Sequence, residues 1–307
     1  MLQCPLCNYT NICKYATATD VEYFTTSGQF DFYECRNCEV LFIHPVPLKE
    51  LAVIYPANYY SFTSKSKSIP FRIKNFIDTH FYKKILKKIP SKTLRVLDVG
   101  GGSGTLLDSI KNADKRVTHT QVVDIDAGAM ALAEKKGHHY YCGTIENFED
   151  PIPYDVILML NLIEHVGDPT QVLTRAAGLL SVNGVIIIKT PNYKSLDSRI
   201  FKKTYWGGLH CPRHWILFTK NSFSNLAYEC NLGVDQFTYT QGAPFWSFSI
   251  LHWMNEHKWI RASKSNPLIY HPLFPILGVG FAVFDFLRKP FAPLSQMFFV
   301  LSKNQSQ

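Results

Sequence analysis

Val96-Leu97-Asp98-Val99-Gly100-Gly101-Gly102-Ser103-Gly104 is the stretch that decides the fold of this 307-residue chain. An apolar run that ends on an acid and continues into alternate glycines predicts a buried strand turning sharply into a helix. Glycine is needed there because the turn requires dihedrals that glycine adopts at low cost, and because a side chain would keep a ligand away from the backbone. The stretch therefore predicts a turn that holds a nucleotide-like cofactor.

A second acidic strand end follows this turn. Residues Thr120–Val123 predict a strand that ends at Asp124, about 20 residues after the glycines, where an acid can accept hydrogen bonds from ribose hydroxyls. Dinucleotide sites have the spacing G-x-G-x-x-G, whereas this chain has Asp98-x-Gly100-x-Gly102-x-Gly104. That form resembles motif I of the class I S-adenosylmethionine-dependent methyltransferases.

The resemblance continues in order along the chain. Later segments are similar to the family's acidic second strand, adenine-side loop, fourth strand with its loop, and glycine turn with the fifth strand: Val122–Asp126, Gly143–Glu146, Tyr154–Val166 and Leu179–Ile188. Two further strands are expected at Val234–Thr240 and, antiparallel to the rest, Met297–Leu301. The resemblance implies an α/β fold with a Rossmann-like seven-stranded sheet, and S-adenosylmethionine as the cofactor.

The resemblance also implies the residues that bind this cofactor: Asp98, Gly100, Gly102, Gly104, Asp124, Ile125, Thr144, Ile145 and Asn161. The glycines would lie against the methionine part, Asp98 would orient its amino group and Asn161 would close that end. Asp124 would take the ribose, Ile125 and Ile145 would sandwich the adenine, and Thr144 or its neighbours would reach the ring edge. A structural alternative remains for several of them, since Asp98 can cap the turn, Ile125 can be core and Asn161 can end a strand. Asp126 is better placed to cap the helix that begins near Ala127.

Two cysteine pairs near the start of the chain predict a metal site. Cys4-Pro5-Leu6-Cys7 and Cys35-Arg36-Asn37-Cys38 each place two thiolates on one tight turn, and together they complete a tetrahedral shell for a structural zinc ion. The alternative is four unrelated thiols, and Asn8 and Glu39 stand where zinc knuckles often carry glycine. A cysteine module followed by a Pro-x-Pro and a Tyr59-Tyr60 segment resembles the start of methyltransferases from sugar and cell-envelope glycan pathways. These tyrosines either face the substrate or pack the module on the catalytic domain.

Residues 205–219 are too rich in glycine, proline and aromatic residues for a helix and predict an active-site loop. His214 in this loop resembles the histidine that acts as base in zinc-module sugar C-methyltransferases, and a neutral imidazole can take a proton near pH 7. The alternative is a histidine that only bonds the loop. An alternative use of this loop is that Arg213 positions an anionic group such as a nucleotide diphosphate, for which its fork geometry is suited. Thr219 is expected to cap the helix that follows.

Composition and patterning divide the chain into three parts. Residues 1–60 form the zinc module with a connecting helix, residues 61–92 a linker and a basic amphipathic helix at 71–89, and residues 93–307 the methyltransferase domain. The helix covers a sheet edge or contacts anionic lipid or phosphate. An apolar insertion at about 241–295 forms a helical hairpin that serves as a lid or as a membrane-contacting surface, and its prolines and charges exclude a transmembrane helix.

These patterns predict an enzyme that methylates oxygen or carbon of a sugar, nucleotide sugar or glycan, which includes a lipid-linked glycan. The alternatives are an O-methyltransferase of a quinone or small phenol, and a cofactor-binding scaffold without catalysis. The presence of Asp98 and Asp124 favours catalysis. A net charge of +8 without an aromatic-bearing nucleic-acid module disfavours nucleic acid, and the absence of a secretory signal favours the cytoplasm, with membrane association if the insertion contacts lipid.

Overall fold

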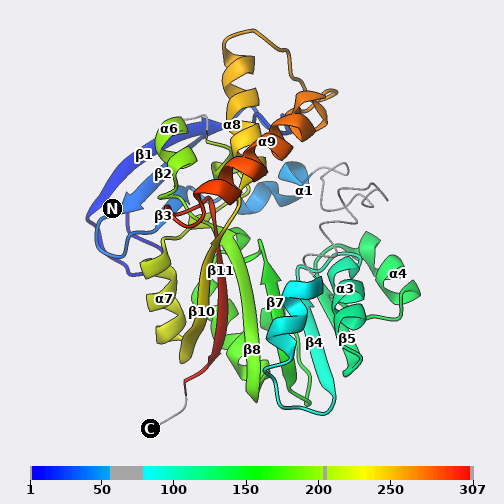
Figure 1. Cartoon of the computed structure of the whole chain (residues 1–307). Coiled ribbons are helices and arrows are strands. Elements are labelled where there is room, and N and C mark those ends of the chain that lie inside the picture. Colours follow the sequence, from blue (N-terminus) through cyan, green and yellow to red (C-terminus); the bar gives the residue numbers. More distant parts are fainter. Residues whose placement is uncertain (1, 56–78, 203–205, 305–307) are drawn as a thin grey trace.

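A seven-stranded sheet forms the body of the protein in the computed structural model, which describes residues 2–55, 79–202 and 206–304 (Figure 1). The strand order is β10-β11-β8-β7-β4-β5-β6. In that order the strands are Leu232–Thr240, Gln296–Lys303, Leu180–Pro191, Tyr154–Leu160, Leu94–Val99, Val117–Asp124 and His139–Cys142. Strands β4 to β8 are parallel and β11 runs antiparallel to both neighbours. The predicted Rossmann-like α/β sheet with an antiparallel last strand is confirmed.

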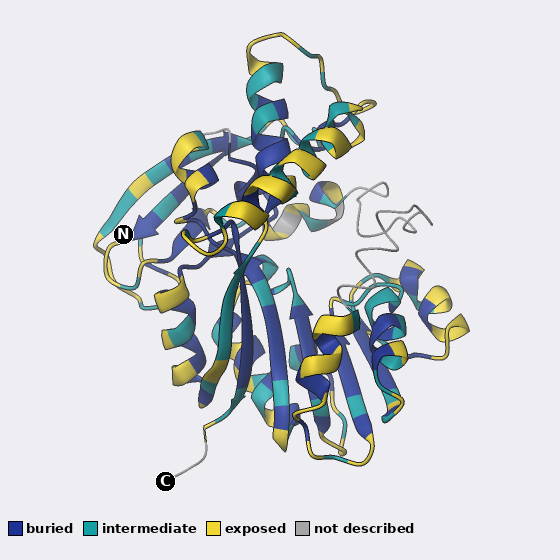
Figure 2. Cartoon of the chain, viewed as in Figure 1, coloured by how far each residue is buried: buried dark blue, intermediate teal, exposed yellow. Residues whose placement is uncertain are grey.

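The central strands are continuous apolar runs because helices cover both faces of the sheet. Neighbouring residues of one strand belong to different cores, since successive side chains point to opposite faces: Leu97 and Ile157 lie in one apolar cluster, Val96 and Val156 in the other. The helices beside the sheet are α3 (Thr105–Ala113), α4 (Ala127–Lys135), α5 (Pro169–Leu179) and α7 (Lys220–Glu229). Figure 2 shows the buried residues concentrated along these strands.

A second sheet has four strands, and three of them belong to the amino-terminal module. Its order is β1-β2-β3-β9, with β1 at Ile12–Thr19, β2 at Gln29–Cys35, β3 at Leu41–His44 and β9 at Ile216–Leu217. Strand β9 comes from the segment between β8 and β10 of the large sheet, and it pairs Leu217 with Leu41 and Ile216 with Phe42 of β3. The amino-terminal module and the predicted active-site loop therefore share one sheet.

The insertion between β10 and β11 is a helical hairpin of α8 (Ala243–Glu256) and α9 (Leu273–Arg288), with a short turn of helix, η5 (Leu268–Tyr270), between them. In Figure 1 it projects above the end of the large sheet that also carries the small sheet. The predicted helical hairpin is confirmed. Within the described residues, no helix has the length and apolar character that crossing a membrane requires.

Local signals in the sequence place the other elements. Asp126 caps α4 by accepting a hydrogen bond from the Gly128 amide, and Thr219 caps α7 in a capping box with Ser222, both as predicted. Residues 79–86 are helical within the predicted helix at 71–89, and Tyr59, Tyr60 and the rest of that linker lie outside the described residues. The remaining short helices are η1 (Leu48–Glu50), α1 (Leu51–Ile54), η2 (Ile145–Asn147), η3 (Ile163–His165), α6 (Leu196–Phe201) and η4 (Gly207–Leu209).

Candidate functional site

The glycine turn joins β4 to α3 at the carboxyl end of the parallel strands. Gly100, Gly102 and Gly104 have φ angles of 74°, 51° and 69°, in the left-handed region that other residues adopt at a cost. A side chain at Gly104 would also lie 2.4 Å from the His138 ring. The sequence therefore has glycine where backbone and packing both require it, and the turn leaves the amino end of α3 open to an anionic group.

Asp124 ends β5 beside this turn. Its carboxylate accepts hydrogen bonds from the Gly102 amide at 2.8 Å and from the Asp126 amide at 2.9 Å. Asp98 is buried at the end of the neighbouring strand β4, which is in register with β5. The fold thus brings both acids to the glycine turn, as a site for the amino and ribose groups of S-adenosylmethionine requires.

The other predicted cofactor residues follow β5, β6 and β7. Ile125 is 64% exposed beside Asp124, and Thr144 is exposed before η2. Ile145, in contrast, is 2% exposed and belongs to the core under the sheet. Asn161 follows β7 with a left-handed φ of 55°, and its side-chain amide donates to Glu164 at 3.2 Å. The acids, Ile125 and Asn161 thus lie at successive strand ends, where cofactors bind in open α/β sheets.

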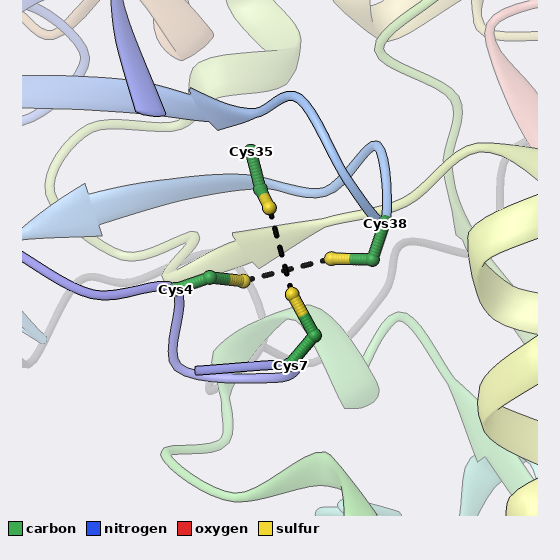
Figure 3. A group of neighbouring side chains, drawn as sticks. All are labelled: Cys4, Cys7, Cys35 and Cys38. Atoms are coloured by element: carbon green, nitrogen blue, oxygen red, sulfur yellow. Dashed lines mark hydrogen bonds between the residues drawn. The ribbon is translucent and has the colours of Figure 1, made fainter. Parts of the chain in front are cut away.

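The two cysteine pairs form matching knuckles (Figure 3). In each, the backbone amide after the second cysteine donates to the carbonyl of the first: Asn8 to Cys4 at 3.0 Å, and Glu39 to Cys35 at 3.1 Å. Asn8 and Glu39 have φ angles of 59° and 55°, the left-handed conformation for which zinc knuckles often use glycine. The two turns therefore keep the knuckle conformation even though asparagine and glutamate stand in place of glycine.

The four sulfur atoms of Cys4, Cys7, Cys35 and Cys38 converge on one point. The Cys4–Cys38 and Cys7–Cys35 sulfur distances are 3.5 and 3.6 Å, far longer than a disulfide and close to the edge of a tetrahedron with zinc–sulfur bonds of about 2.3 Å. The hydrogen bond from Cys38 lowers the pKa of the Cys4 thiol to about 5. The geometry and the donor set fit a structural zinc ion, with no ligand position left for chemistry.

His214 is buried two residues before β9, the short strand that joins the module sheet. Its Nδ1 lies 2.8 Å from the Gly208 carbonyl oxygen, and its Nε2 lies 3.9 Å from a Glu164 carboxylate oxygen. Burial lowers the pKa of His214 well below its usual range and raises that of Glu164 to about 7. The ring is therefore neutral at pH 7 and keeps a lone pair on one nitrogen, although burial makes it a weaker base than a free imidazole.

Glu164 and His165, in the loop after β7, complete this cluster. The Glu164 carboxylate accepts from Asn161 and, at 3.0 Å, from the Thr190 hydroxyl. His165 places its Nδ1 3.0 Å from the Arg213 carbonyl oxygen and its ring 4.7 Å from that of His214. Ligand atoms of Glu164, His165 and His214 all lie within 4.8 Å of one another, a set that could also hold a divalent cation.

A buried ion pair and a buried contact between a carboxylate and an imidazole attach the module to this loop. Asp20 binds Arg213 at 2.9 Å with both side chains 0% exposed, and Glu22 binds His210 at 2.5 Å. The Arg213 guanidinium also donates to the Ile54 carbonyl oxygen. The prediction that Arg213 positions an anionic ligand is wrong, because its charge is already neutralised in the interior by Asp20.

Asp20 and Glu22 are residues of the site that the sequence patterns do not predict. They bind residues 193 and 188 positions later, so no local spacing signals the contact. The only signal is the acidic pair that follows the strand Ile12–Thr19. Close to Glu22 and His210, a pocket is lined by residues of the module, the loop and the hairpin, including Trp206, Phe248 and His252.

The sheet order, the glycine turn and the acids at adjacent strand ends define a class I S-adenosylmethionine-dependent methyltransferase. Residues 73–236, 164 of the 307 residues, match the family described as "Methyltransferase domain", and the chain belongs to this family of enzymes. In structure, it is similar to a coclaurine N-methyltransferase bound to N-methylheliamine and S-adenosylhomocysteine. That match has a TM-score of 0.52 and 14% identity and covers 84% of this chain and 81% of the other, which supports the fold alone.

Sequence relatives match over a shorter segment. The chain is 33% identical over 122 residues to a ubiquinone biosynthesis O-methyltransferase of Rhodopseudomonas palustris, covering 36% of this chain and 46% of the relative. A mitochondrial protein of the same name from Dictyostelium discoideum is 31% identical over 147 residues, covering 40% of this chain and 44% of the relative. The chain thus spans less than half the length of these relatives.

Proposed function

We propose that this methyltransferase methylates a hydroxyl or an acidic carbon of its acceptor, and that His214 removes the acceptor's proton. The tautomer of His214 carries this proposal. The Gly208 carbonyl oxygen can only accept a hydrogen bond, so the neutral ring holds its proton on Nδ1 and a lone pair on Nε2. That lone pair is on the nitrogen closest to Glu164, and the negative charge of this group in its ionised form would stabilise the imidazolium that forms.

The chain's residues divide the work between binding and proton transfer. Asp124 and the glycine turn would hold the cofactor, and Asn161 would place its methionine end beside His214. S-adenosylmethionine supplies an electrophilic methyl group whose bond electrons stay on sulfur. The acceptor atom forms the new bond to that methyl group, and its proton passes to His214 Nε2.

A sugar, nucleotide sugar or glycan is the first acceptor class that we propose. The cysteine module supports it, because the module resembles those of methyltransferases from glycan pathways. The alternative is a quinone or other small phenol, and the relatives named ubiquinone biosynthesis O-methyltransferase support that class. A panel of nucleotide sugars, lipid-linked glycans and isoprenylated catechols, assayed with radiolabelled S-adenosylmethionine, separates the two.

Substitution of His214 tests the proton transfer. The variant His214→Asn keeps a donor for the Gly208 carbonyl oxygen but cannot take a proton at that position. We expect S-adenosylmethionine affinity to stay within about two-fold while methyl transfer slows about 100-fold or more. His119→Asn, a substitution of a half-buried histidine on β5, is the control and should leave both unchanged. Full activity of His214→Asn would leave His214 a structural residue.

A divalent cation on Glu164, His165 and His214 is the second candidate for this cluster, because their ligand atoms lie close enough to share an ion. The cation content of the purified protein distinguishes the two. One zinc ion per chain, with activity unchanged by a chelator that leaves this zinc bound, supports the base. A second cation that is lost in both His165→Asn and His214→Asn, together with the activity, would assign His214 as a ligand.

A further inference from the structure

Exposed apolar side chains gather on the α8–α9 hairpin. Among the described residues, nine large apolar side chains that are exposed lie between positions 259 and 291: Trp259, Tyr270, Ile276, Val279, Val283, Phe284, Phe286, Leu287 and Phe291. We call these nine the hairpin face. Phe286 is 75% exposed and Phe291 86% exposed. Figure 2 shows the exposed stretches along α9. Exposed apolar residues elsewhere are scattered over many elements, so this concentration marks an interaction surface.

The orientation of α9 is fixed by its contacts with α8. Phe281 stacks on Trp246 with ring centres 4.9 Å apart, and Phe274 lies edge-on against Phe248 at 4.8 Å. The buried Asp285 carboxylate accepts from the Gly242 amide at 2.8 Å. These contacts hold one side of α9 against α8. The apolar residues on the other side of α9 are therefore exposed to solvent because of the way the helix is packed.

The outward residues of α9 follow helical spacing. Ile276, Val279, Val283 and Leu287 are separated by three or four positions, which places them on one stripe. The two charged residues of the helix, Asp285 and Arg288, bind each other at 3.1 Å, and Asp285 is fully buried. The stripe therefore presents apolar surface without a competing charge.

Exposed basic residues lie on both sides of α9 along the chain. Lys258, Arg261 and Lys264 are exposed in the segment before α9, and Lys289 is exposed after it. Glu256 is the exposed acid of the described hairpin. Trp259 and Tyr270 stand among the basic residues, a combination of amphipathic rings, apolar side chains and cations that fits the headgroup region of an anionic membrane. If two copies of this chain met through the hairpin face, their basic residues would lie close together and repel each other.

We propose that the hairpin face docks on the interface of a membrane that contains anionic lipid. The apolar stripe would insert between headgroups while the four exposed basic residues contact lipid phosphates, each contributing about a five-fold gain in partitioning. The same hairpin walls the pocket beside His210, through Phe248, His252 and Leu268. Docking would therefore hold that pocket next to the lipid surface, where an acceptor with an apolar tail would be presented. The presentation of an acceptor to the pocket rests on the proposed function, whereas docking on the membrane does not.

Flotation of the full chain with lipid vesicles tests the proposal. We expect binding to vesicles of phosphatidylcholine with one quarter phosphatidylglycerol, and at least ten-fold weaker binding to phosphatidylcholine alone. Phe286→Ser combined with Leu287→Ser should lower partitioning to the anionic vesicles at least ten-fold. Lys264→Gln combined with Lys289→Gln should do so by a similar factor and should flatten the dependence on salt.

The control replaces apolar residues that are equally exposed outside the hairpin, Val182→Ser with Tyr228→Ser, and should bind vesicles as the wild type does. S-adenosylmethionine affinity, measured on every variant, reports that the fold is intact. Absence of vesicle binding by the wild type, or equal binding by the hairpin variants, would overturn the proposal. So would a dimer that forms without lipid and is lost in Phe286→Ser with Leu287→Ser. A wild-type protein that binds vesicles but methylates no acceptor of the panel would count against the proposed function and still support docking.

Discussion

The ion pair between Asp20 and Arg213 gives the sharpest prediction for stability. Replacing Asp20 with asparagine keeps the size of the side chain but removes the counter-charge of a guanidinium that is 0% exposed. Asp20 also accepts hydrogen bonds from the Tyr23 and Thr25 amides, so it is held from several sides. The substitution leaves a cation buried without its partner, and we expect the free energy of unfolding to fall by about 3–5 kcal/mol.

An exposed ion pair of the same module provides the matched control. Lys14 and Asp31 lie 2.8 Å apart, but their side chains are 54% and 32% exposed. Solvent screens this pair, so Asp31→Asn should cost about 0–1 kcal/mol. The two variants remove the same chemical group from the same module, and the pairs differ chiefly in burial, with the hydrogen bonds that Asp20 accepts from backbone amides adding to the expected difference.

Chemical denaturation of the wild type and both variants measures the two free energies. Adding Arg213→Met to Asp20→Asn should recover part of the loss, because no charge then remains in the interior. If Asp20→Asn costs no more than Asp31→Asn, the buried pair does not attach the module to the loop that carries His214, and the reasoning fails.

Three further predictions concern pH, the cofactor and the metal. Burial alone would raise the pKa of Asp20, but the charge of Arg213 and the hydrogen bonds from Arg213 and Thr25 outweigh it and lower the pKa. The stability contributed by Asp20 is therefore fully present above the unfolded value of about 3.9 and is lost as the pH falls through the lower folded value. The difference between wild type and Asp20→Asn should thus stay constant from about pH 5 to 8 and shrink below about pH 4, as followed by denaturation at each pH. Asp124→Ala should weaken S-adenosylmethionine binding by about 1–3 kcal/mol in calorimetry, because the ribose loses a charged acceptor, and unchanged affinity would contradict its role. Cys38→Ser should lower the zinc content measured by mass spectrometry well below one ion per chain, whereas Cys142→Ser, at an exposed cysteine on β6, should leave it unchanged.

Much of the large sheet could be predicted from the sequence because its signals are local. The apolar run before Asp98, the alternate glycines and the acid at Asp124 each depend on a few neighbouring residues, and they set the strand, the turn and the cofactor end of the sheet. Asp126 and Thr219 were likewise predicted as caps, since a cap depends on the backbone within three residues.

The surroundings of His214 could not be predicted in this way. The sequence suggested that Arg213 positions an anionic ligand, but its burial against Asp20 makes it a link between module and loop. The pairing of β9 with β3 depends on chain segments about 175 residues apart, as Leu217 with Leu41 shows. A contact between such distant segments leaves no sign in the local pattern of the sequence.

The sequence by itself determined the class of the fold, the cofactor turn and the paired cysteines, because short-range spacing and backbone conformation decide these features. The tertiary structure alone decided that the cysteine module completes its sheet with the strand after His214. It also decided which side of α9 packs on α8 and which side stays outside. These features depend on which side chains are buried and on which segments pack together. Both are settled only when distant parts of the chain come into contact in the folded protein.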